Sequence, residues 1–97
     1  MCGIAGIISK DIRQIPETTV QTMRASILYR GRDEQDEWND GQNVHFLHSR
    51  LSIIDLTTGH QPMWDISGRY VIIYNGEIYN YKELRVIYER LGARFET

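Results

Sequence analysis

The sequence predicts an α+β fold in which helices pack on a mainly antiparallel sheet. Two observations support this prediction. Apolar residues alternate with polar or small ones in several short segments and recur at helical spacing in two longer ones. Asp40-Gly41 and Ser67-Gly68 each separate two extended segments, which is typical of β-hairpins. With 97 residues the chain is one small domain or part of one. The predicted order is strand, helix, several antiparallel strands, helix, strand.

The first half of the chain supplies a strand and a helix. The segment "CGIAGIIS" at residues 2–9 predicts a buried strand, strongest at Ile7-Ile8. Pro16 with the acidic Glu17 beside it is typical of the first turn of a helix, which we expect to continue to about residue 30. Four apolar residues share one face at helical spacing: Val20, Met23, Ile27 and Leu28.

The second half predicts further strands and a second helix. We expect strands at residues 44–47 and 70–74, with a loop at "TTGHQP". From about Tyr79 the spacing becomes helical until Gly92, a typical helix end. The closing "GARFET" resembles the start of another strand, so we expect the front part of a longer domain. The apolar positions of the second helix are Leu84, Ile87, Tyr88 and Leu91.

The composition is typical of a soluble globular protein. The chain is 41% hydrophobic and 25% charged, and its net charge of −2 disfavours nucleic acid or an acidic membrane as partner. A single cysteine excludes an intrachain disulfide, which fits a reducing compartment. The N-terminus lacks the features of a secretory signal, and apolar runs fall short of the ~20 residues of a membrane helix. We therefore expect a cytoplasmic location.

The one cysteine stands directly after the initiator methionine. Removal of Met1 would place the Cys2 thiol beside a free α-amino group, which titrates near ~7.7–8.0 rather than the ~10.4 of a lysine. That amine can accept the thiol's proton, so one residue supplies both nucleophile and base. Position alone is equally consistent with a small structural residue, because free cysteine is often buried.

The segment "VIIYNGEIYNY" has two interpretations. Asn75-Gly76 between apolar stretches favours a type I′ hairpin turn when taken alone. The helical spacing that soon follows indicates instead a junction between a strand and a helix, or between a strand and a loop. In a junction, the Asn75 carboxamide N–H and the Gly76 backbone N–H are suitable donors to a developing oxyanion. Glu77, beside them, could receive a substrate ammonium group.

Arg50 and the histidines are weaker candidates. A guanidinium can bind a carboxylate through two hydrogen bonds, although a solitary arginine such as Arg50 is usually solvated. His45 and His48 are three positions apart, which places them on opposite faces of a strand, and His60 stands alone in a loop. With only one cysteine in addition, no metal site is expected.

Several motifs together are much more specific than any one alone. They are "MCGIAG", "RGRDE", "HSRLSIIDL", "GHQPM" and "YNGEIYNYKEL". Taken in order, these motifs closely resemble the N-terminal glutaminase domain of glutamine-dependent asparagine synthetases. That family comprises class II glutamine amidotransferases of the N-terminal-nucleophile hydrolase fold, an αββα sandwich. The resemblance is weakest at residues 10–22 and 34–46. It implies that residues 1–97 are the N-terminal part of such a domain, without the synthetase domain.

The resemblance implies a role for each matching residue. Cys2, freed of Met1, would attack the side-chain amide of glutamine and form a γ-glutamyl thioester, with Asn75 and Gly76 as the oxyanion hole. Arg50 would hold the substrate's α-carboxylate, and Glu77 would help to fix its polar end. Water would then release glutamate. The implied substrate-binding residues are Arg50, Leu51, Ser52, Ile53, Ile54, Asn75, Gly76 and Glu77.

The resemblance also implies partners. Besides glutamine, these are a C-terminal synthetase domain or a separate acceptor enzyme. A homo-oligomer is a separate expectation, because sheet edges that missing strands would cover tend to associate. The synthetase makes asparagine from aspartate with ATP and Mg²⁺. No residue of this segment is expected to bind either of these, so no cofactor is expected here.

The chain departs from the family pattern in two places. The usual His-Arg-Gly-Pro-Asp is replaced by residues 29–33, in which Tyr29 stands for histidine and Arg32 for proline. The aspartate that binds the substrate ammonium in the family follows "FET" and lies past Thr97. Two alternative functions stay open at this point: delivery of ammonia to another carboxylate acceptor, and a truncated module that binds without turnover. Retention of Met1 would favour the second, because it blocks the amine.

Overall fold

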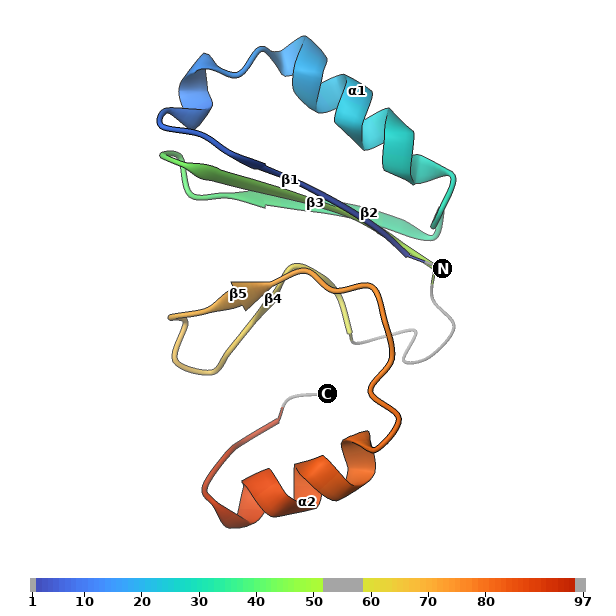
Figure 1. The fold of residues 1–97 in the computed structure, drawn as a ribbon, viewed down its shortest axis with the longest axis vertical. Helices are drawn as coiled ribbons and strands as arrows, with labels where there is room; N and C mark the ends of the chain where they lie inside the picture. The colour runs from blue at the N-terminus through green and yellow to red at the C-terminus, as the bar shows by residue number, and fades with distance from the viewer. Residues whose placement is uncertain (1, 52–58, 96–97) are drawn as a thin grey trace.

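The computed structural model describes residues 2–51 and 59–95. These residues form the predicted α+β fold, with two helices and two antiparallel sheets. Figure 1 shows four levels in succession: helix α1 (Glu17–Leu28), a three-stranded sheet, a two-stranded sheet and helix α2 (Tyr81–Arg90). No helix within the described ranges is long and apolar enough to cross a membrane.

The three-stranded sheet carries the N-terminus. Its strands are β1 (Gly3–Ile8), β2 (Glu34–Asn39) and β3 (Val44–Arg50), in the order β1-β3-β2. The predicted hairpin at Asp40-Gly41 is confirmed, because β2 and β3 pair antiparallel on either side of it. Gly41 adopts a φ of 73°. The Asp40 carboxylate accepts hydrogen bonds from the backbone N–H groups of Gln42, Asn43 and Val44. Strand β3 extends beyond the predicted residues 44–47 because it has a partner on both sides.

Helix α1 covers one face of this sheet, as Figure 1 shows. Its Val20 and Ile27 are buried with Leu47 of β3, and Met23 packs against them. The prediction that Leu28 shares this face is wrong, since Leu28 is 41% exposed at the last turn of the helix. A short 3-10 turn (Ile12–Gln14) joins β1 to α1.

Strand β1 is only half buried, which corrects the prediction of a buried strand. It lies at the edge of the sheet, and only one of its faces is covered by α1. Ala5 and Ile7 point to the core, whereas Ile8, on the opposite face, is 85% exposed. The alternation follows from the two-residue period of a strand.

The second sheet is a short hairpin of β4 (Met63–Trp64) and β5 (Val71–Ile72). Its turn contains Gly68 with a φ of 72°, as the sequence predicted. Strand β5 is shorter than the predicted residues 70–74 because its partner is only two residues long. Trp64 meets Trp38 of β2 edge to face, with ring centroids 5.3 Å apart, and this contact joins the two sheets.

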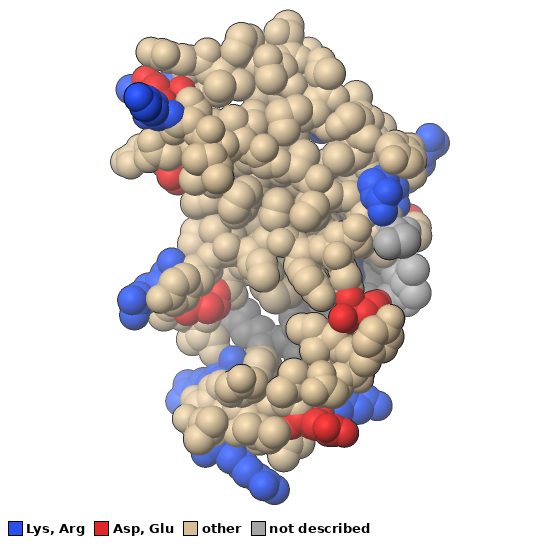
Figure 2. Space-filling view, in the orientation of Figure 1, with Lys and Arg blue, Asp and Glu red and all other residues tan. Residues whose placement is uncertain are grey.

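Helix α2 matches its prediction and ends before Gly92, whose φ is 98°. None of its residues is buried in the structure, so its predicted apolar face is exposed. No strand occurs at residues 93–95, contrary to the expectation for "GARFET", and the last two residues lie outside the described ranges. Lys and Arg are scattered at the periphery of the face shown in Figure 2, around a broad uncharged area.

Candidate active site

Cys2 lies at the start of the edge strand β1, where three elements meet. Its Sγ is 3.9 Å from the carbonyl oxygen of Leu51, which follows β3. Its own carbonyl oxygen accepts a 3.0 Å hydrogen bond from Nε of Arg30, just after α1. Gly3 allows this junction, because a Cβ at that position would lie 3.0 Å from Ile27 of α1. The thiol is partly exposed, so it is accessible to a small molecule.

A cavity of about 190 Å³ opens beside the Cys2 thiol. Its lining includes residues from three parts of the chain: the N-terminus, the residue after β3, and the segment that leads from β5 to α2. Five of the residues predicted from the sequence line it, together with two that the sequence analysis did not select, Gln61 and Tyr74. The full set is Cys2, Leu51, Gln61, Tyr74, Asn75, Gly76 and Glu77.

The structure decides between the two interpretations of Asn75-Gly76. The pair does not join two strands; it lies in the irregular segment between β5 and α2. Tyr74 folds its side chain over Gly76, so that a Cβ at Gly76 would lie 2.7 Å from the phenol oxygen. The hairpin favoured by the dipeptide alone is therefore wrong here, and the junction is correct. Both residues reach the cavity from this junction.

Arg50 is buried, which corrects the interpretation of this arginine as a solvated surface residue. Only 5% of it is exposed at the end of the central strand β3. Its guanidinium lies 3.5 Å from a carboxylate oxygen of Glu34 and 3.4 Å from Nδ1 of His60. Arg50 does not line the cavity itself, although Leu51, the next residue, does. Its assignment to the substrate carboxylate stays a prediction.

Glu34 links Arg50 to the loop that follows. Its carboxylate oxygens lie 2.6 and 2.8 Å from Nδ1 of His60. The hydrogen bond from His60, and to a smaller extent the Arg50 guanidinium, lower the pKa of Glu34. Glu34 was not among the residues predicted from the sequence, and the prediction that His60 stands alone in its loop is wrong, since it contacts both Glu34 and Arg50. Ser52, Ile53 and Ile54, three of the predicted substrate-binding residues, lie outside the described residues.

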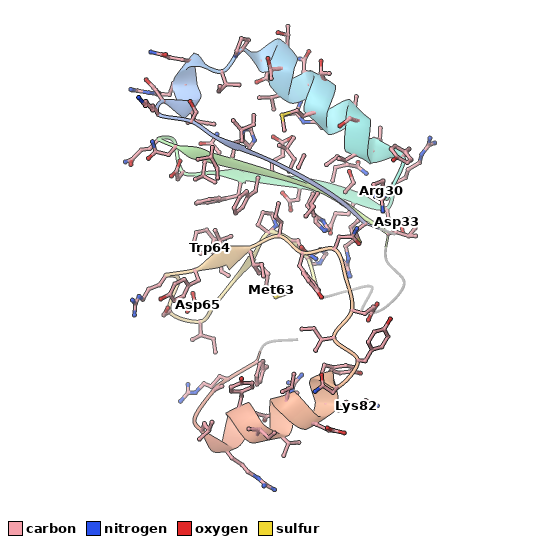
Figure 3. All side chains as sticks on the ribbon, in the orientation of Figure 1. Arg30, Asp33, Met63, Trp64, Asp65 and Lys82 are labelled. Carbon is pink, nitrogen blue, oxygen red and sulfur yellow. The ribbon has the colours of Figure 1, made fainter. Side chains whose placement is uncertain are left out.

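The "RGRDE" segment packs directly on the end of β3. A Cβ at Gly31 would lie 2.5 Å from the carbonyl carbon of Arg50 and 2.6 Å from the backbone nitrogen of Leu51. The backbone N–H of Asp33 donates a 3.0 Å hydrogen bond to the carbonyl oxygen of Arg50. Arg30 and Asp33 lie together at the end of the sheet nearest the N-terminus (Figure 3). This segment therefore supports the cavity wall at Leu51.

The two histidines of β3 are buried and lie outside the lining of the cavity at Cys2. Nε2 of His45 lies 2.9 Å from the Glu37 carboxylate, which also binds Arg24. His48 is 2% exposed, and its Nε2 has no hydrogen-bond partner within the described residues. Burial lowers the pKa of His48, opposed in part by the backbone of Tyr74. Residues 2–51 and 59–95 contain no group of three His, Cys, Asp or Glu side chains suited to a metal ion.

A larger cavity elsewhere carries no comparable chemistry. Its volume is about 410 Å³, and it is an apolar hollow beside the β4–β5 hairpin and residues 94–95. Met63, Trp64 and Asp65, labelled in Figure 3, belong to its lining. The smaller cavity at Cys2 is the candidate site, because it holds the only cysteine next to amide donors and a carboxylate.

Comparison with known proteins gives the family. The model of the family described as "Glutamine amidotransferase domain" matches residues 1–97. The chain belongs to this family. The comparison with solved structures found no significant match.

The relatives of the amidotransferase domain are named as synthetases. "Asparagine synthetase [glutamine-hydrolyzing] 1" of Bacillus subtilis is 41% identical over 100% of this chain and 16% of its own length. "Asparagine synthetase [glutamine-hydrolyzing] 2" of the same organism is 42% identical over 88% of this chain and 12% of its own length. A putative asparagine synthetase of Mycobacterium tuberculosis is 50% identical over 76% of the chain and 13% of its own length. The chain thus spans 12 to 16% of these relatives, in their N-terminal region.

Proposed function

We propose that this chain is the glutamine-hydrolysing part of an asparagine synthetase-like amidotransferase, with Cys2 as its nucleophile. The observation that carries the proposal is the cavity at Cys2. It brings Cys2 together with Asn75, Gly76 and Glu77, three consecutive residues that lie far from Cys2 in the sequence. Membership of the amidotransferase domain family and the names of the relatives support the same reaction.

The first step forms a thioester. After removal of Met1, the α-amine of Cys2 accepts the thiol proton, and the sulfur attacks the side-chain carbonyl carbon of glutamine. The developing oxyanion receives hydrogen bonds from the carboxamide of Asn75 and the backbone N–H of Gly76. When the intermediate collapses, its C–N bond breaks, and ammonia leaves with the proton that the amine had taken up.

The second step regenerates the enzyme. Water attacks the γ-glutamyl thioester, with the α-amine again as base, and the same two donors stabilise the second oxyanion. The C–S bond then breaks, the thiol recovers its proton, and glutamate leaves. No histidine is needed as base in this scheme, which is consistent with a cavity lining that contains none.

Recognition of glutamine requires groups of both signs, because the amino acid is zwitterionic at its backbone end. Arg50 is the proposed partner of the α-carboxylate, and the resemblance assigns residues 51–54 to glutamine binding as well. Glu77 is the proposed partner of the ammonium group. In the structure Arg50 contacts Glu34 and His60 at the end of β3, and a guanidinium is suited to bind a carboxylate through two hydrogen bonds.

The finer architecture belongs to the same proposal. The succession of helix, sheet, sheet and helix in Figure 1 is consistent with part of an αββα sandwich of the N-terminal-nucleophile type. The ammonia would serve a synthetase domain that uses ATP and Mg²⁺ to amidate aspartate. That domain is a proposal from the resemblance alone, and a homo-oligomeric assembly is a proposal from the tendency of unpaired sheet edges to associate.

Intact mass spectrometry with a glutamine-analogue electrophile tests this function. We expect the purified chain to lack Met1 and to take up one equivalent of 6-diazo-5-oxo-norleucine at Cys2, with protection by glutamine. The Cys2→Ser variant should remain unlabelled. Ammonia release from glutamine should follow the same pattern. Labelling that glutamine does not suppress, or an unreactive Cys2 with a free α-amine, would contradict the proposal.

A further inference from the structure

Gln61 makes two hydrogen bonds to the backbone of one residue, Tyr74. Its Nε2 donates to the Tyr74 carbonyl oxygen at 3.0 Å, and its Oε1 accepts from the Tyr74 N–H at 2.5 Å. A primary carboxamide presents a donor and an acceptor side by side, as a neighbouring strand does. Gln61 therefore replaces a strand partner with its side chain. Both residues line the cavity at Cys2.

The strand register explains why a side chain is used at this point. The β4–β5 ladder ends at the pair Met63–Ile72. Continuing that antiparallel register would set Gln61 opposite Tyr74, with Pro62 between Gln61 and the ladder. Proline has no N–H and cannot extend a ladder through its own backbone. The two polar backbone groups of Tyr74 thus find their partners in the Gln61 carboxamide.

The two hydrogen bonds act on the peptide groups that flank Tyr74. Its N–H belongs to the peptide bond with Ile73, and its carbonyl oxygen belongs to the peptide bond with Asn75. A peptide group is planar, so fixing the Tyr74 carbonyl also fixes the direction of the Asn75 N–H and the start of the Asn75 backbone. Only Asn75 separates this fixed peptide group from Gly76, and the Tyr74 ring lies over Gly76.

Among the described residues, the side chains of this segment are only partly packed. Tyr74 is 41% exposed and Ile72 is 54% exposed. A second, apolar cavity of about 270 Å³ borders Gln61 and Tyr74 on another side, so side-chain packing there is incomplete. The backbone of Tyr74 also interacts with the buried His48 of β3. The two hydrogen bonds of Gln61 are therefore the larger part, though not all, of what orients Asn75-Gly76.

We propose that Gln61 is a positioning residue that orients the Asn75-Gly76 donors through the backbone of Tyr74. The inference rests on the proposed function for the role of those donors, whereas the structural coupling of Gln61 to Asn75 stands independently. Gln61 does not act on the substrate directly. Its loss should therefore lower kcat for glutamine hydrolysis by about ten-fold and leave KM within about two-fold. Removal of an oxyanion donor itself typically costs ~100–1,000-fold.

The test compares Gln61→Met with Gln21→Met. Methionine keeps the length of the side chain without its hydrogen bonds, and Gln21 is exposed on α1, outside the cavity lining. In the full 97-residue chain, amide hydrogen exchange and ¹⁵N–¹H spectra report the backbone of residues 74–76. We expect at least ten-fold faster exchange at Tyr74 and shifted signals of Asn75 and Gly76 in Gln61→Met only.

The two proposals fail in different ways. A wild-type chain that neither binds the electrophile nor releases ammonia contradicts the proposed function, while the amide measurements still test Gln61. Unchanged exchange at Tyr74, or unmoved signals of Asn75 and Gly76, would overturn the positioning role. The role is also overturned if the wild type is active and Gln61→Met keeps its kcat. A rise in KM alone would assign Gln61 to substrate binding and overturn positioning.

Discussion

Trp38 and Trp64 hold the two sheets of the molecule together through an edge-to-face contact. Their ring centroids are 5.3 Å apart with an interplanar angle of 86°. Trp38 lies on β2 of the three-stranded sheet, and Trp64 lies on β4 of the hairpin. The contact fixes how the hairpin, and with it the start of the segment towards Asn75, sits against the sheet that carries Cys2.

The Trp38–Trp64 contact predicts a measurable coupling. Aromatic pairs of this geometry contribute ~0.5–1.5 kcal/mol beyond area burial, so a double-mutant cycle of Trp38→Ala and Trp64→Ala should give a coupling of that size in urea unfolding. The matched cycle of Trp38→Ala with Tyr79→Ala should be additive, because Tyr79 is 95% exposed. Equal coupling in both cycles would contradict a direct contact.

Gly31→Ala should destabilise the chain strongly. The added Cβ would meet the backbone of Arg50 and Leu51 at 2.5 and 2.6 Å, and a strand backbone cannot rotate away as a side chain can. Overpacking of this kind typically costs ~1–3 kcal/mol, and we expect the upper part of that range from denaturant unfolding. The control is Gly6→Ala, where the nearest atom would be 3.4 Å away. An equal effect of both substitutions would show that the close approach is not the cause.

His48 should make stability depend on pH below about 6.5. Burial lowers the pKa of His48 in the folded state below its ordinary value of 6.5, so His48 binds a proton more readily in the unfolded chain. The folding stability linked to neutral His48 is fully present above the pKa of His48 in the unfolded chain. It is lost as pH falls from that value towards the lower pKa of His48 in the folded state. We expect urea unfolding to show a decline in stability from pH 7 to 5 that His48→Phe reduces. An unchanged slope in that variant would contradict the assignment.

Glu37 should govern a second, more acidic window. Its pKa is lowered first by the hydrogen bond from Arg24 and then by that from His45. Because the folded-state pKa is depressed, the stabilisation is present above the ordinary value of 4.5 and is lost as pH falls through the folded value. Glu37→Gln should be less stable at pH 7 and lose less between pH 5 and 3. Glu89→Gln, on the exposed side of α2, should keep the wild-type acid profile.

Arg50→Lys tests the proposed carboxylate site. Lysine keeps the charge but lacks the fork that binds a carboxylate through two hydrogen bonds. We expect KM for glutamine to rise about ten-fold with kcat within about two-fold, measured by ammonia release. Arg13→Lys is the control, because the Arg13 side chain is 78% exposed and pairs only with a neighbouring aspartate among the described residues. An unchanged KM in Arg50→Lys would remove Arg50 from substrate binding.

Much of the secondary structure could be predicted because it depends on local patterns. The hairpins at Gly41 and Gly68 and the end of α2 at Gly92 require a positive φ, which glycine adopts at little cost, so a short segment indicates each of them. Helix α1 likewise follows from the spacing of Val20, Met23 and Ile27. The predictions failed where a long-range partner decides, as in the half-exposed β1 and the short β5.

For the site, the sequence by itself determined which chemical groups are present and where they stand in the chain. It placed Cys2 behind Met1 and supplied Asn75, Gly76 and Glu77 in one segment. Only the tertiary structure decided that these groups share one cavity, that Asn75-Gly76 is a junction rather than a hairpin, and that Arg50 is buried beside Glu34. The physical reason is that burial and hydrogen-bond partners depend on contacts between distant residues. Gln61 shows this most directly, since its proposed role depends on hydrogen bonds to the backbone of Tyr74, which is distant in the sequence and lines the same cavity.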